Sequence, residues 1–263
     1  MKYQIVCSYP IFNMPKDTKF KRLYIDIETS PNVVFSWNVG YDLQINYENI
    51  IEERQIICIC YKWANEKQVY SIKRTGGNEK SMLKEITKVM NEADQIVGHN
   101  GNKFDIPWIR TRCLFYGIPM IPDYKTIDTL KLCRSGFRLN SNKLDYVAQF
   151  LGLGKKMDTG GFGLWKEICL NKSAKALQKM IDYCKKDVIL LEKVYDKISP
   201  YVKHTMHVGV IEGKDKCSCV ECGSVNVQSR GYLVNAGGGK KRRLNCQDCG
   251  SWYSIPIKLV KTK

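Results

Sequence analysis

The sequence of 263 residues lacks an apolar run long enough to cross a membrane, and its first ten residues, MKYQIVCSYP, lack the apolar core of a signal peptide. It also lacks internal repeats, and its one low-complexity tract is the three glycines at 237–239. These absences argue against a membrane-spanning, secreted or repeat protein. We therefore expect a globular protein in a cytoplasm-like compartment, where disulfides are not expected although the sequence contains 12 cysteines.

Histidine is scarce, with three residues in the chain, and this limits the catalytic sites that the sequence can build. A catalytic thiolate usually needs a neighbouring base, and no cysteine of the first 200 residues has a nearby histidine to suggest one. We interpret those cysteines mostly as small core residues: Cys7, Cys58, Cys60, Cys113, Cys133, Cys169 and Cys184. His204 and His207 are interpreted as linker residues rather than metal ligands.

Negative charge is also in short supply, because 26 Asp and Glu face 42 Lys and Arg and leave a net charge of +16. Such an excess favours a polyanionic partner, and nucleic acid is the first candidate. An anionic membrane surface is an alternative, but no amphipathic anchor stands out, so we expect no membrane partner. A merely solvated lysine-rich surface stays open, because charge alone does not exclude it.

Positive charge and cysteine are both concentrated after residue 200, where five of the 12 cysteines lie. This shift in composition predicts a domain boundary. We expect one domain over residues 1–200, a linker over 201–216 and a small C-terminal domain over 217–263.

The hydrophobic pattern of the first 200 residues predicts a meander of strands followed by alternating helices and strands. We expect strands over 22–28, 55–63, 68–73 and 95–100. We expect helices over 79–92, from about residue 105, over 143–151 and over 173–198. This order predicts an α/β domain with a mixed sheet and helices on its faces.

Two acidic residues interrupt an apolar strand in the stretch RLYIDIETSP, residues 22–31. Side chains two residues apart point to the same face of a strand, so Asp26 and Glu28 lie side by side. Burial and mutual repulsion of two carboxylates cost free energy, so a compensating group is expected beside them. A strand edge exposed to water is the alternative.

The long helix predicted over 173–198 carries a third carboxylate toward the sheet, because Asp187 lies beside its apolar stripe. Tyr183 precedes Asp187 by one helical turn on the same side. A partly exposed helix flank is the alternative reading of Asp187. Since both predicted elements carry acids toward the interior, the sequence favours one shared site.

A fourth carboxylate, Asp105, follows a short predicted strand that breaks at Gly98. Sheets of α/β proteins place their sites at such strand ends, whereas a helix N-cap ahead of Pro107 is the alternative. Four acids without partnering histidines suit hard cations such as Mg²⁺ or Mn²⁺. Two such ions clamp the attacking and leaving oxygens of a phosphoryl displacement, so a basic protein with this site is predicted to be a nuclease.

Three motifs in chain order resemble those of the DEDD superfamily of 3′–5′ exonucleases: YIDIET (24–29), HNGNKFD (99–105) and YCKKD (183–187). The third has tyrosine four residues before aspartate, as in the tyrosine branch, whereas the histidine branch would need histidine where this chain has Asp182. The surrounding stretches resemble phage-encoded predicted exonucleases related to the proofreading domain of family B DNA polymerases: DIETSPN, IDTLKLCR, SNKLDYVAQFLGLGKK and LW. The resemblance covers residues 20–200.

This resemblance implies a ribonuclease H-like fold, which is a five-stranded mixed sheet with helices on both faces, and a site with two Mg²⁺ or Mn²⁺ ions. It implies that Asp26 bridges both ions. Glu28 and Asp187 would complete the site of the ion that binds the attacking water, and Asp105 would hold the second ion partly through water. Tyr183 would orient that water and could help to deprotonate it.

The resemblance also matches Thr29, Asn100 and Phe104 to positions that surround the 3′-terminal nucleotide. No polymerase domain accompanies the motifs, so we expect any proofreading to act in trans, with a DNA polymerase or another replication factor as partner. If the protein is encoded by a phage, it would work in the host cytoplasm. Asp128 is open between a place near the site and a structural cap, and residues 30–54 have no assignment.

The C-terminal segment carries two Cys-x-x-Cys-Gly knuckles, Cys219/Cys222 and Cys246/Cys249. Two such pairs predict a four-cysteine site for one structural Zn²⁺, and Cys217 is an alternative ligand with poorer spacing. The segment is too short to bury a core of its own, so the metal would supply its folding energy. We expect a zinc ribbon with strands near 225–234 and 241–245.

The basic run GGGKKRR (237–243) differs from a phosphate-binding P-loop, because no Ser or Thr follows the lysine in register. We interpret it as a ribbon turn whose Lys240, Arg242 and Arg243 contact a nucleic-acid backbone.

The sequence therefore favours a metal-dependent 3′–5′ exonuclease acting on single-stranded DNA. An RNA exonuclease or a structure-specific endonuclease on the same fold stays open, because such a site contacts backbone rather than base identity. A catalytically silent nucleic-acid-binding module is the weaker alternative, because all four acids and the tyrosine are present.

Overall fold

The computed structural model describes residues 19–40, 42–64, 66–75, 77–157 and 160–257. Contacts divide the chain into two compact units, Lys21–Tyr195 and a second unit that joins Asp196–Lys263 to residues up to Phe20. The linker boundaries expected from composition stay a prediction, and Cys7 lies outside the described residues.

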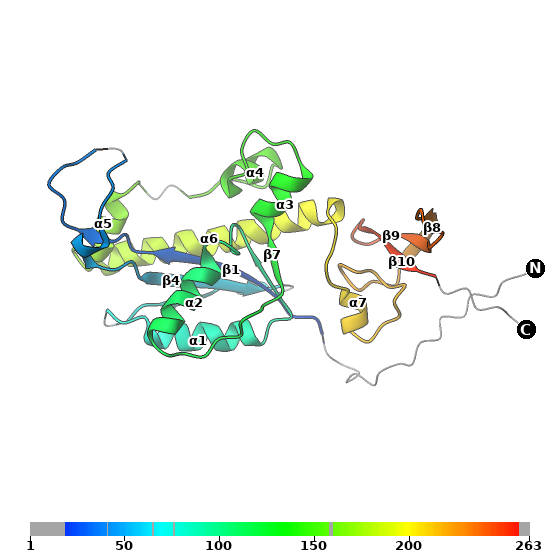
Figure 1. Ribbon diagram of the computed structural model, residues 1–263, viewed down its shortest axis with the longest axis horizontal. Helices are drawn as coiled ribbons and strands as arrows, with labels where there is room; N and C mark the ends of the chain where they lie inside the picture. Colours follow the sequence, from blue (N-terminus) through cyan, green and yellow to red (C-terminus); the bar gives the residue numbers. More distant parts are fainter. Residues whose placement is uncertain (1–18, 41, 65, 76, 158–159, 258–263) are drawn as a thin grey trace, which may run out of the picture. The chain divides into compact units, whose positions relative to one another are not determined.

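The unit Lys21–Tyr195 is built on a five-stranded sheet of order β5-β4-β1-β6-β7 (Figure 1). The central strand β1 pairs antiparallel with β4 and parallel with β6, so the sheet is mixed, and the predicted fold class is confirmed. The five strands are β1 (Arg22–Thr29), β4 (Ile56–Trp63), β5 (Tyr70–Lys73), β6 (Gln95–Gly98) and β7 (Thr126–Asp128).

The side chains of β1 point alternately to the two faces of the sheet and therefore meet different helices. Leu23, Ile25 and Ile27 of β1 belong to a buried cluster with residues of helices α1 (Lys80–Asn91) and α2 (Asp105–Phe115). The alternate side chains face α6 (Ala174–Ile198), as shown by the Tyr24 ring lying 6.2 Å from that of Tyr195. Figure 1 shows α6 and α1 on opposite sides of this sheet. The acids of β1 lie on the α6 face, where Cys184 Sγ contacts Asp26 Oδ2 at 3.4 Å.

The longer predicted elements match the structure closely, whereas several short ones were not predicted. The predicted helices over 79–92, 143–151 and 173–198 correspond to α1, α4 and α6. The helices that were not predicted are short, so the helical spacing of apolar residues repeats too few times in them to be recognised. The remaining helices of this unit are α3 (Thr129–Gly136), α4 (Leu144–Phe150) and α5 (Gly163–Cys169). Within the described residues, no helix is both long and apolar enough to cross a membrane.

The segment without a sequence assignment leaves the sheet after β1 and returns at β4. It contains the two-stranded pair β2 (Val33–Val34) and β3 (Ile50–Glu52), with a short 3-10 helix η1 (Tyr47–Asn49). Its base is fastened by hydrogen bonds from the Gln55 amide to Ser30 Oγ at 3.0 Å and from the Arg54 amide to Asn32 Oδ1 at 2.7 Å.

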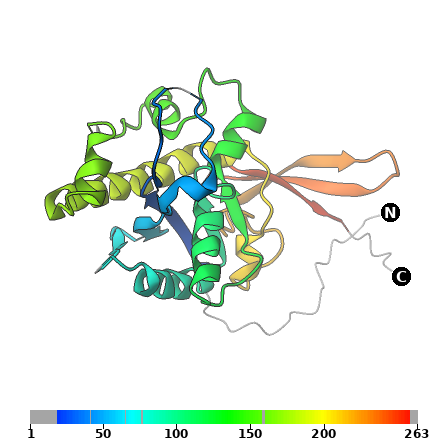
Figure 2. The ribbon, with the colours of Figure 1, turned by 60° about the vertical axis from the view of Figure 1, so that its left-hand side comes forward.

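The second unit contains a three-stranded antiparallel sheet of order β10-β9-β8, and Figure 2 shows β8 and β9 as a long two-stranded arm in orange. Two of these strands were predicted, whereas β10 was not. The elements of this unit are η2 (Ser199–Tyr201), α7 (Val208–Ile211), β8 (Val227–Val234), β9 (Lys240–Cys246) and β10 (Trp252–Pro256).

Candidate active site and cysteine cluster

Three of the predicted acids converge between the sheet and α6. Asp26 and Glu28 project from β1, and Asp187 projects from α6 and is 1% exposed. One carboxylate oxygen from each lies within 4.8 Å of the other two. Residues far apart in the sequence thus meet because strand alternation and the apolar stripe of α6 turn them to the same side.

Asp105 lies beside this group and is held by the backbone of β1. Strand β6 pairs with β1 only as far as Tyr24, so the Ile27 amide has no strand partner on that side. Asp105 Oδ1 accepts a hydrogen bond from this amide at 3.0 Å. Asp105 is the first residue of α2 and its cap position is Phe104, so the N-cap alternative for Asp105 is wrong.

The turn between β6 and α2 places Asp105 by close backbone packing. A Cβ on Gly98 would lie 3.0 Å from the Gly101 Cα, and a Cβ on Gly101 would lie 3.1 Å from the Gly98 Cα. Asn100 takes a positive φ of 69° within the same turn. Side chains at the two glycines would force the turn apart, so both positions favour glycine.

Without a cation, the clustered carboxylates repel one another and are held away from water, which makes their ionised forms unfavourable. Burial, followed by the charges of Asp105, Glu28 and Asp187, raises the pKa of Asp26 well above its usual range. Burial and Asp187 raise the pKa of Glu28 to about 8. Burial raises the pKa of Asp105 to about 7, against the opposing hydrogen bond from Ile27. Each shift reports the free energy of holding clustered negative charge away from water.

Lys156 is a residue of this site that the sequence analysis missed. Its Nζ donates to Asp187 Oδ2 at 2.5 Å and to the Tyr183 hydroxyl at 3.2 Å. Burial alone would lower the pKa of Lys156, but the nearby charge of Asp187 outweighs it and the pKa is raised. The available signal was the Gly-Leu-Gly-Lys-Lys turn at 152–156, which does not indicate which lysine points inward.

Tyr183 lies one turn before Asp187, as predicted, and burial followed by the Asp187 charge raises its pKa to about 12. It is therefore a neutral hydroxyl near pH 7 and suits orientation of a ligand rather than proton removal. The second carboxylate oxygen of Asp187, Oδ1, is buried without a hydrogen-bond partner among the described residues. An orphaned carboxylate oxygen in an all-oxygen donor group fits a hard divalent cation.

A pocket of about 420 Å³ adjoins this group on the side of Glu28. Thr29 and Phe104 line it, as do the aromatic rings of Phe162 and Trp165, whereas Asn100 does not line it. Trp165 Nε1 donates to the Thr29 carbonyl at 3.0 Å and fixes one wall. Two of the three residues matched to the terminal nucleotide thus border one cavity.

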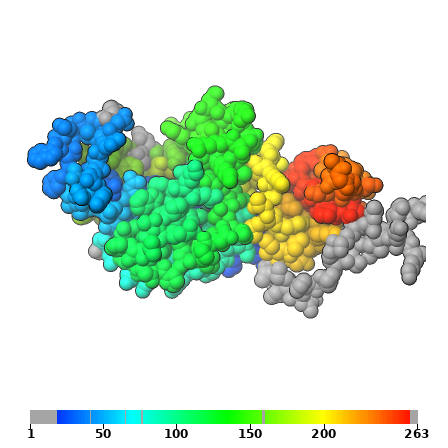
Figure 3. Space-filling view, in the orientation of Figure 1, coloured from blue at the N-terminus to red at the C-terminus, as the bar shows by residue number. Residues whose placement is uncertain are grey.

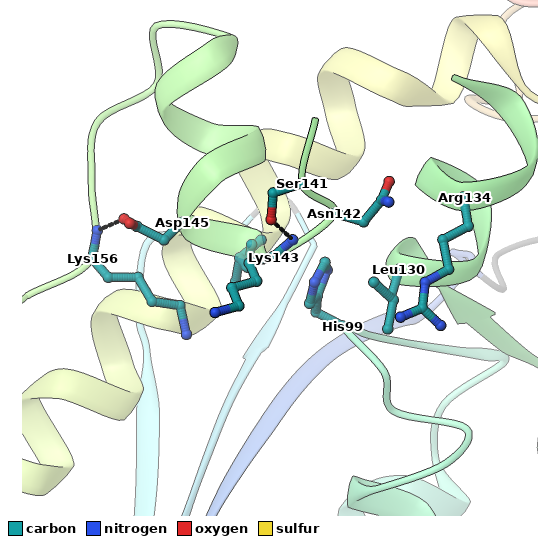
Figure 4. Close-up of a pocket in the computed structure, with 9 residues that line it drawn as sticks. His99, Leu130, Arg134, Ser141, Asn142, Lys143, Asp145 and Lys156 are labelled. Carbon is teal, nitrogen blue, oxygen red and sulfur yellow. Dashed lines mark hydrogen bonds between the residues drawn. The ribbon is translucent and has the colours of Figure 1, made fainter. Parts of the chain in front are cut away.

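A second pocket of about 520 Å³ has Lys156 in its wall. Figure 4 shows Lys156 and Arg134 at its two ends, with His99 and Lys143 between them. Burial lowers the pKa of His99 to about 4, so the imidazole is neutral near pH 7 and the charge of the pocket comes mainly from the longer cations. A cationic cavity beside an acid group suits an anionic polymer.

Asp128 has a structural role. Its carboxylate accepts from the amides of Leu130 and Lys131 at the start of α3 and from the Asn100 amide at 2.9 Å. Asp128 is therefore a helix cap that also fixes the turn before Asp105, and the capping alternative is the one that the structure supports.

The four predicted knuckle cysteines form one group in the second unit. The sulfur atoms of Cys219 and Cys249 lie 3.5 Å apart, and those of Cys222 and Cys246 lie 3.6 Å apart. Four sulfurs each 2.3 Å from a central ion are separated by about 3.8 Å in a tetrahedron, so the donor set fits zinc. The cluster does not include Cys217, whose carbonyl accepts from the Tyr253 hydroxyl at 2.7 Å.

Neither histidine of the predicted linker joins the cysteine group. His204 Nδ1 contacts a Glu221 carboxylate oxygen at 2.9 Å, and His207 Nε2 contacts the Lys216 carbonyl at 3.0 Å. The interpreted core cysteines are buried: Cys58, Cys60, Cys113, Cys133, Cys169 and Cys184.

Comparisons with known proteins agree with this architecture. The sequence profile of the RNase H superfamily matches residues 23–199. A DNA polymerase of Methanocaldococcus jannaschii is 35% identical over 83 residues, which are 32% of this chain and 5% of the polymerase. The solved family B DNA polymerase of Pyrobaculum calidifontis superposes with a TM-score of 0.52 at 14% identity, over 84% of this chain and 32% of the polymerase. The chain thus spans a small part of each relative, and the second likeness concerns the fold alone.

Proposed function

The chain belongs to the RNase H superfamily, and from that premise we propose that it is a divalent-metal-dependent 3′–5′ exonuclease of the tyrosine branch acting on single-stranded DNA. The observation that carries the proposal is the convergence of Asp26, Glu28 and Asp187, with carboxylate oxygens within 4.8 Å of one another. The raised pKa values of these acids and the orphaned Asp187 oxygen support occupation by cations.

Asp26, Glu28, Asp105 and Asp187 would hold two Mg²⁺ or Mn²⁺ ions. When bound, these ions supply an activated water and neutralise charge on the leaving oxygen. The tyrosine hydroxyl of Tyr183 would hydrogen-bond the attacking water and set its direction, a role that needs no ionisation.

Lys156 has two partners that the proposal places in the reaction. Its ammonium group holds Asp187 and the Tyr183 hydroxyl in one arrangement before the substrate arrives. A preset arrangement reduces the reorganisation that the reaction requires.

The two pockets support a path for the strand. The terminal nucleoside fits the aromatic pocket beside Glu28, with Phe104 as a stacking surface and Thr29 near the sugar. Upstream phosphates fit the cationic pocket at Lys156 and Arg134. Because the curated relative is a DNA polymerase, DNA is favoured over RNA as the polymer.

The second unit is proposed to be a zinc ribbon over residues 217–263, following a linker over 201–216. Its four thiolates would saturate one Zn²⁺, which makes that ion structural rather than catalytic. Lys240 and Arg243 are exposed on β9, and Arg243 lies 5.3 Å from the Trp252 ring, so the strand presents cations beside an aromatic surface. We assign Lys240, Arg242 and Arg243 to backbone contacts with the strand.

The test uses single-stranded DNA and RNA oligonucleotides labelled at either end, incubated with Mg²⁺ or Mn²⁺. A 3′–5′ exonuclease releases the 3′ label as a mononucleotide at once and produces a ladder from the 5′-labelled strand. Asp187→Asn should be inactive. Asp182→Asn is the matched control, because Asp182 is an exposed acid on the same helix that accepts a hydrogen bond from Gln178 and does not belong to the acid group.

Internal fragments without a ladder would indicate an endonuclease. Cleavage of RNA but not of DNA would show that the substrate is RNA. Binding without cleavage in either metal would overturn the nuclease proposal.

A further inference from the structure

The segment between β1 and β4 borders the aromatic pocket at its base, through Ser30, Pro31 and Arg54. The rest of the segment is a surface that the proposed nuclease activity does not use. We define the flap as residues 31–53, of which Tyr41 lies outside the described residues. Large apolar side chains project from it: Trp37 is 101% exposed, Val39 97% and Tyr47 77%. Figure 3 shows its blue atoms protruding at one end of the unit Lys21–Tyr195. So many exposed apolar groups in one short segment are typical of an interaction surface.

The charge of the flap is opposite to that of the chain. A protein with 42 Lys and Arg has none of them between residues 31 and 53. The flap instead carries four exposed acids: Asp42, Glu48, Glu52 and Glu53. An acidic surface repels phosphates, so the occupant of the flap is a basic surface with apolar groups rather than a nucleic acid.

This chain carries a surface of that kind on the hairpin of β8 and β9. Residues 223–247 contain no Asp or Glu. The hairpin exposes Tyr232 by 57% and Leu233 by 46%, and Trp252 of the adjoining strand β10 is 48% exposed. Its five cations are Arg230, Lys240, Lys241, Arg242 and Arg243. The hairpin thus offers positive charge and apolar area where the flap offers negative charge and apolar area.

We propose that the flap of one copy docks on the β8–β9 hairpin of a second copy. Each copy carries one flap and one hairpin, so a dimer related by a two-fold axis would make the contact twice. Aromatic rings beside carboxylates also present to the hairpin what a single strand presents, namely stacking surfaces and anions. Single-stranded nucleic acid therefore competes with the flap, and only this competition rests on the proposed function.

The docking is tested by sedimentation of the full-length zinc-loaded protein at low salt, between roughly 1 and 100 µM. We expect a concentration-dependent dimer that weakens as salt rises. Glu52→Lys/Glu53→Lys and Arg242→Glu/Arg243→Glu should each raise the dimer dissociation constant at least about 10-fold, because like charges then face each other. The control Glu85→Lys changes an exposed acid on α1 and should leave the dimer unchanged.

Mixing the two charge-reversed proteins is the decisive measurement. A mixed pair has two complementary contacts, one between a reversed flap and a reversed hairpin and one between the two native surfaces. We expect the mixture to dimerise at concentrations at which neither variant does so alone. A native chain that remains monomeric up to roughly 100 µM overturns the proposal, as does a dimer that survives both reversals or a mixture that stays monomeric.

An unlabelled oligodeoxythymidylate, added as a competitor, then tests separately whether the hairpin also binds a single strand. We expect it to dissociate the native dimer. If the protein dimerises and the mixing test succeeds but this strand has no effect, docking stands and the hairpin is not a nucleic-acid contact.

Discussion

The acid group and the cysteine group are both sets of candidate metal ligands, and the sequence assembles them in opposite ways. Cys219 and Cys222 belong to one knuckle, just before β8, and meet a second knuckle at the turn between β9 and β10 of the same unit. Asp26 and Asp187 meet only because a strand and a distant helix pack against each other. The first site depends on local turns, whereas the second depends on the whole fold of its unit.

The two groups also differ in what surrounds them. The acids sit in a unit with an extensive buried core, in which Leu23, Leu83 and Ile86 are 0% exposed. The ribbon sheet buries few apolar side chains among its described residues, chiefly Leu244 and Ile255. The acid site should therefore exist without metal at an electrostatic cost, while the ribbon should need its metal to fold.

Zinc removal should produce the largest effect and should be confined to the ribbon. Structural zinc in small domains contributes an apparent 10–16 kcal/mol or so at neutral pH. A chelator strong enough to remove zinc should make the amides of β8–β10 exchange rapidly with solvent, while those of β1 and β4 stay protected. Hydrogen exchange by mass spectrometry measures both. Equal loss of protection in the two sheets would contradict the comparison.

Asp26→Ala should have the next largest effect, and its effects on activity and stability should have opposite signs. If Asp26 is the metal ligand proposed above, its loss removes several kcal/mol of transition-state stabilisation, roughly 10³-fold or more in rate. Removal of one of several repelling carboxylates should leave the melting temperature of the metal-free protein equal or higher. Nuclease assays and thermal melts with and without Mg²⁺ check both, and Asp182→Ala is the control. An active Asp26→Ala protein would exclude the metal role of this residue.

The free-energy cost of clustering ionised carboxylates should also appear in the pH dependence of stability. Glu28 has a folded pKa of about 8 against an ordinary value of 4.5, so between these values the folded state keeps a proton that the unfolded state has lost. The free energy of unfolding of the zinc-loaded protein without Mg²⁺ or Mn²⁺ should therefore fall as pH rises from 6 to 8, by something on the order of 2 kcal/mol. Saturating Mg²⁺ should reduce that fall, because a cation favours the ionised carboxylates. Thermal melts of the zinc-loaded protein at several pH values test this, and a rise in stability over that range would contradict it.

How much the sequence could predict follows from the same contrast between local and distant features. The strand over 22–28, the long helix and the two knuckles are periodic or fixed in spacing, so their residues could be named in advance. Lys156 could not be, because which lysine of a surface loop turns inward depends on packing. The flap could not be either, because its paired strands are only two and three residues long and its apolar residues follow no period.

Asp105 and Asp128 illustrate the limit within the site. Both are acids next to a helix start, and the same pattern left each open between a cap and a site residue. The structure separates them by one backbone detail, since β6 ends early and leaves the Ile27 amide for Asp105. Asp128 instead meets free amides at the start of α3. Helix propensity indicates in both cases where a helix starts, but it does not indicate which backbone amides the acid will meet.

Tyr183→Phe should have a smaller effect than loss of an acid, because it removes a hydroxyl and keeps the ring. If the hydroxyl orients water, the rate should fall by about 10²-fold at most. With a pKa of about 12, the native tyrosine contributes no ionisation near neutrality, so the pH–rate profiles of both proteins should have the same shape below pH 9. An unchanged rate would assign Tyr183 to packing, and a lost ionisation would make it a base.

The smallest expected effect concerns the ribbon cations and separates binding from chemistry. Arg242→Ala/Arg243→Ala should leave cleavage of short oligonucleotides at low salt nearly unchanged, because the acid group lies in the other unit. Binding to long single strands should weaken. Each lost phosphate contact lowers the slope of log K against log salt by about 0.7, so two lost contacts should lower it by about 1.4. Lys80→Ala/Lys84→Ala removes the same charge from exposed positions of α1 and serves as the control. If both double variants lower the slope equally, the ribbon acts only through net charge. The hypothesis that one unit binds the strand and the other cleaves it would then be wrong. If only the ribbon variant does so, the metal-held hairpin binds the strand that the acid group cleaves.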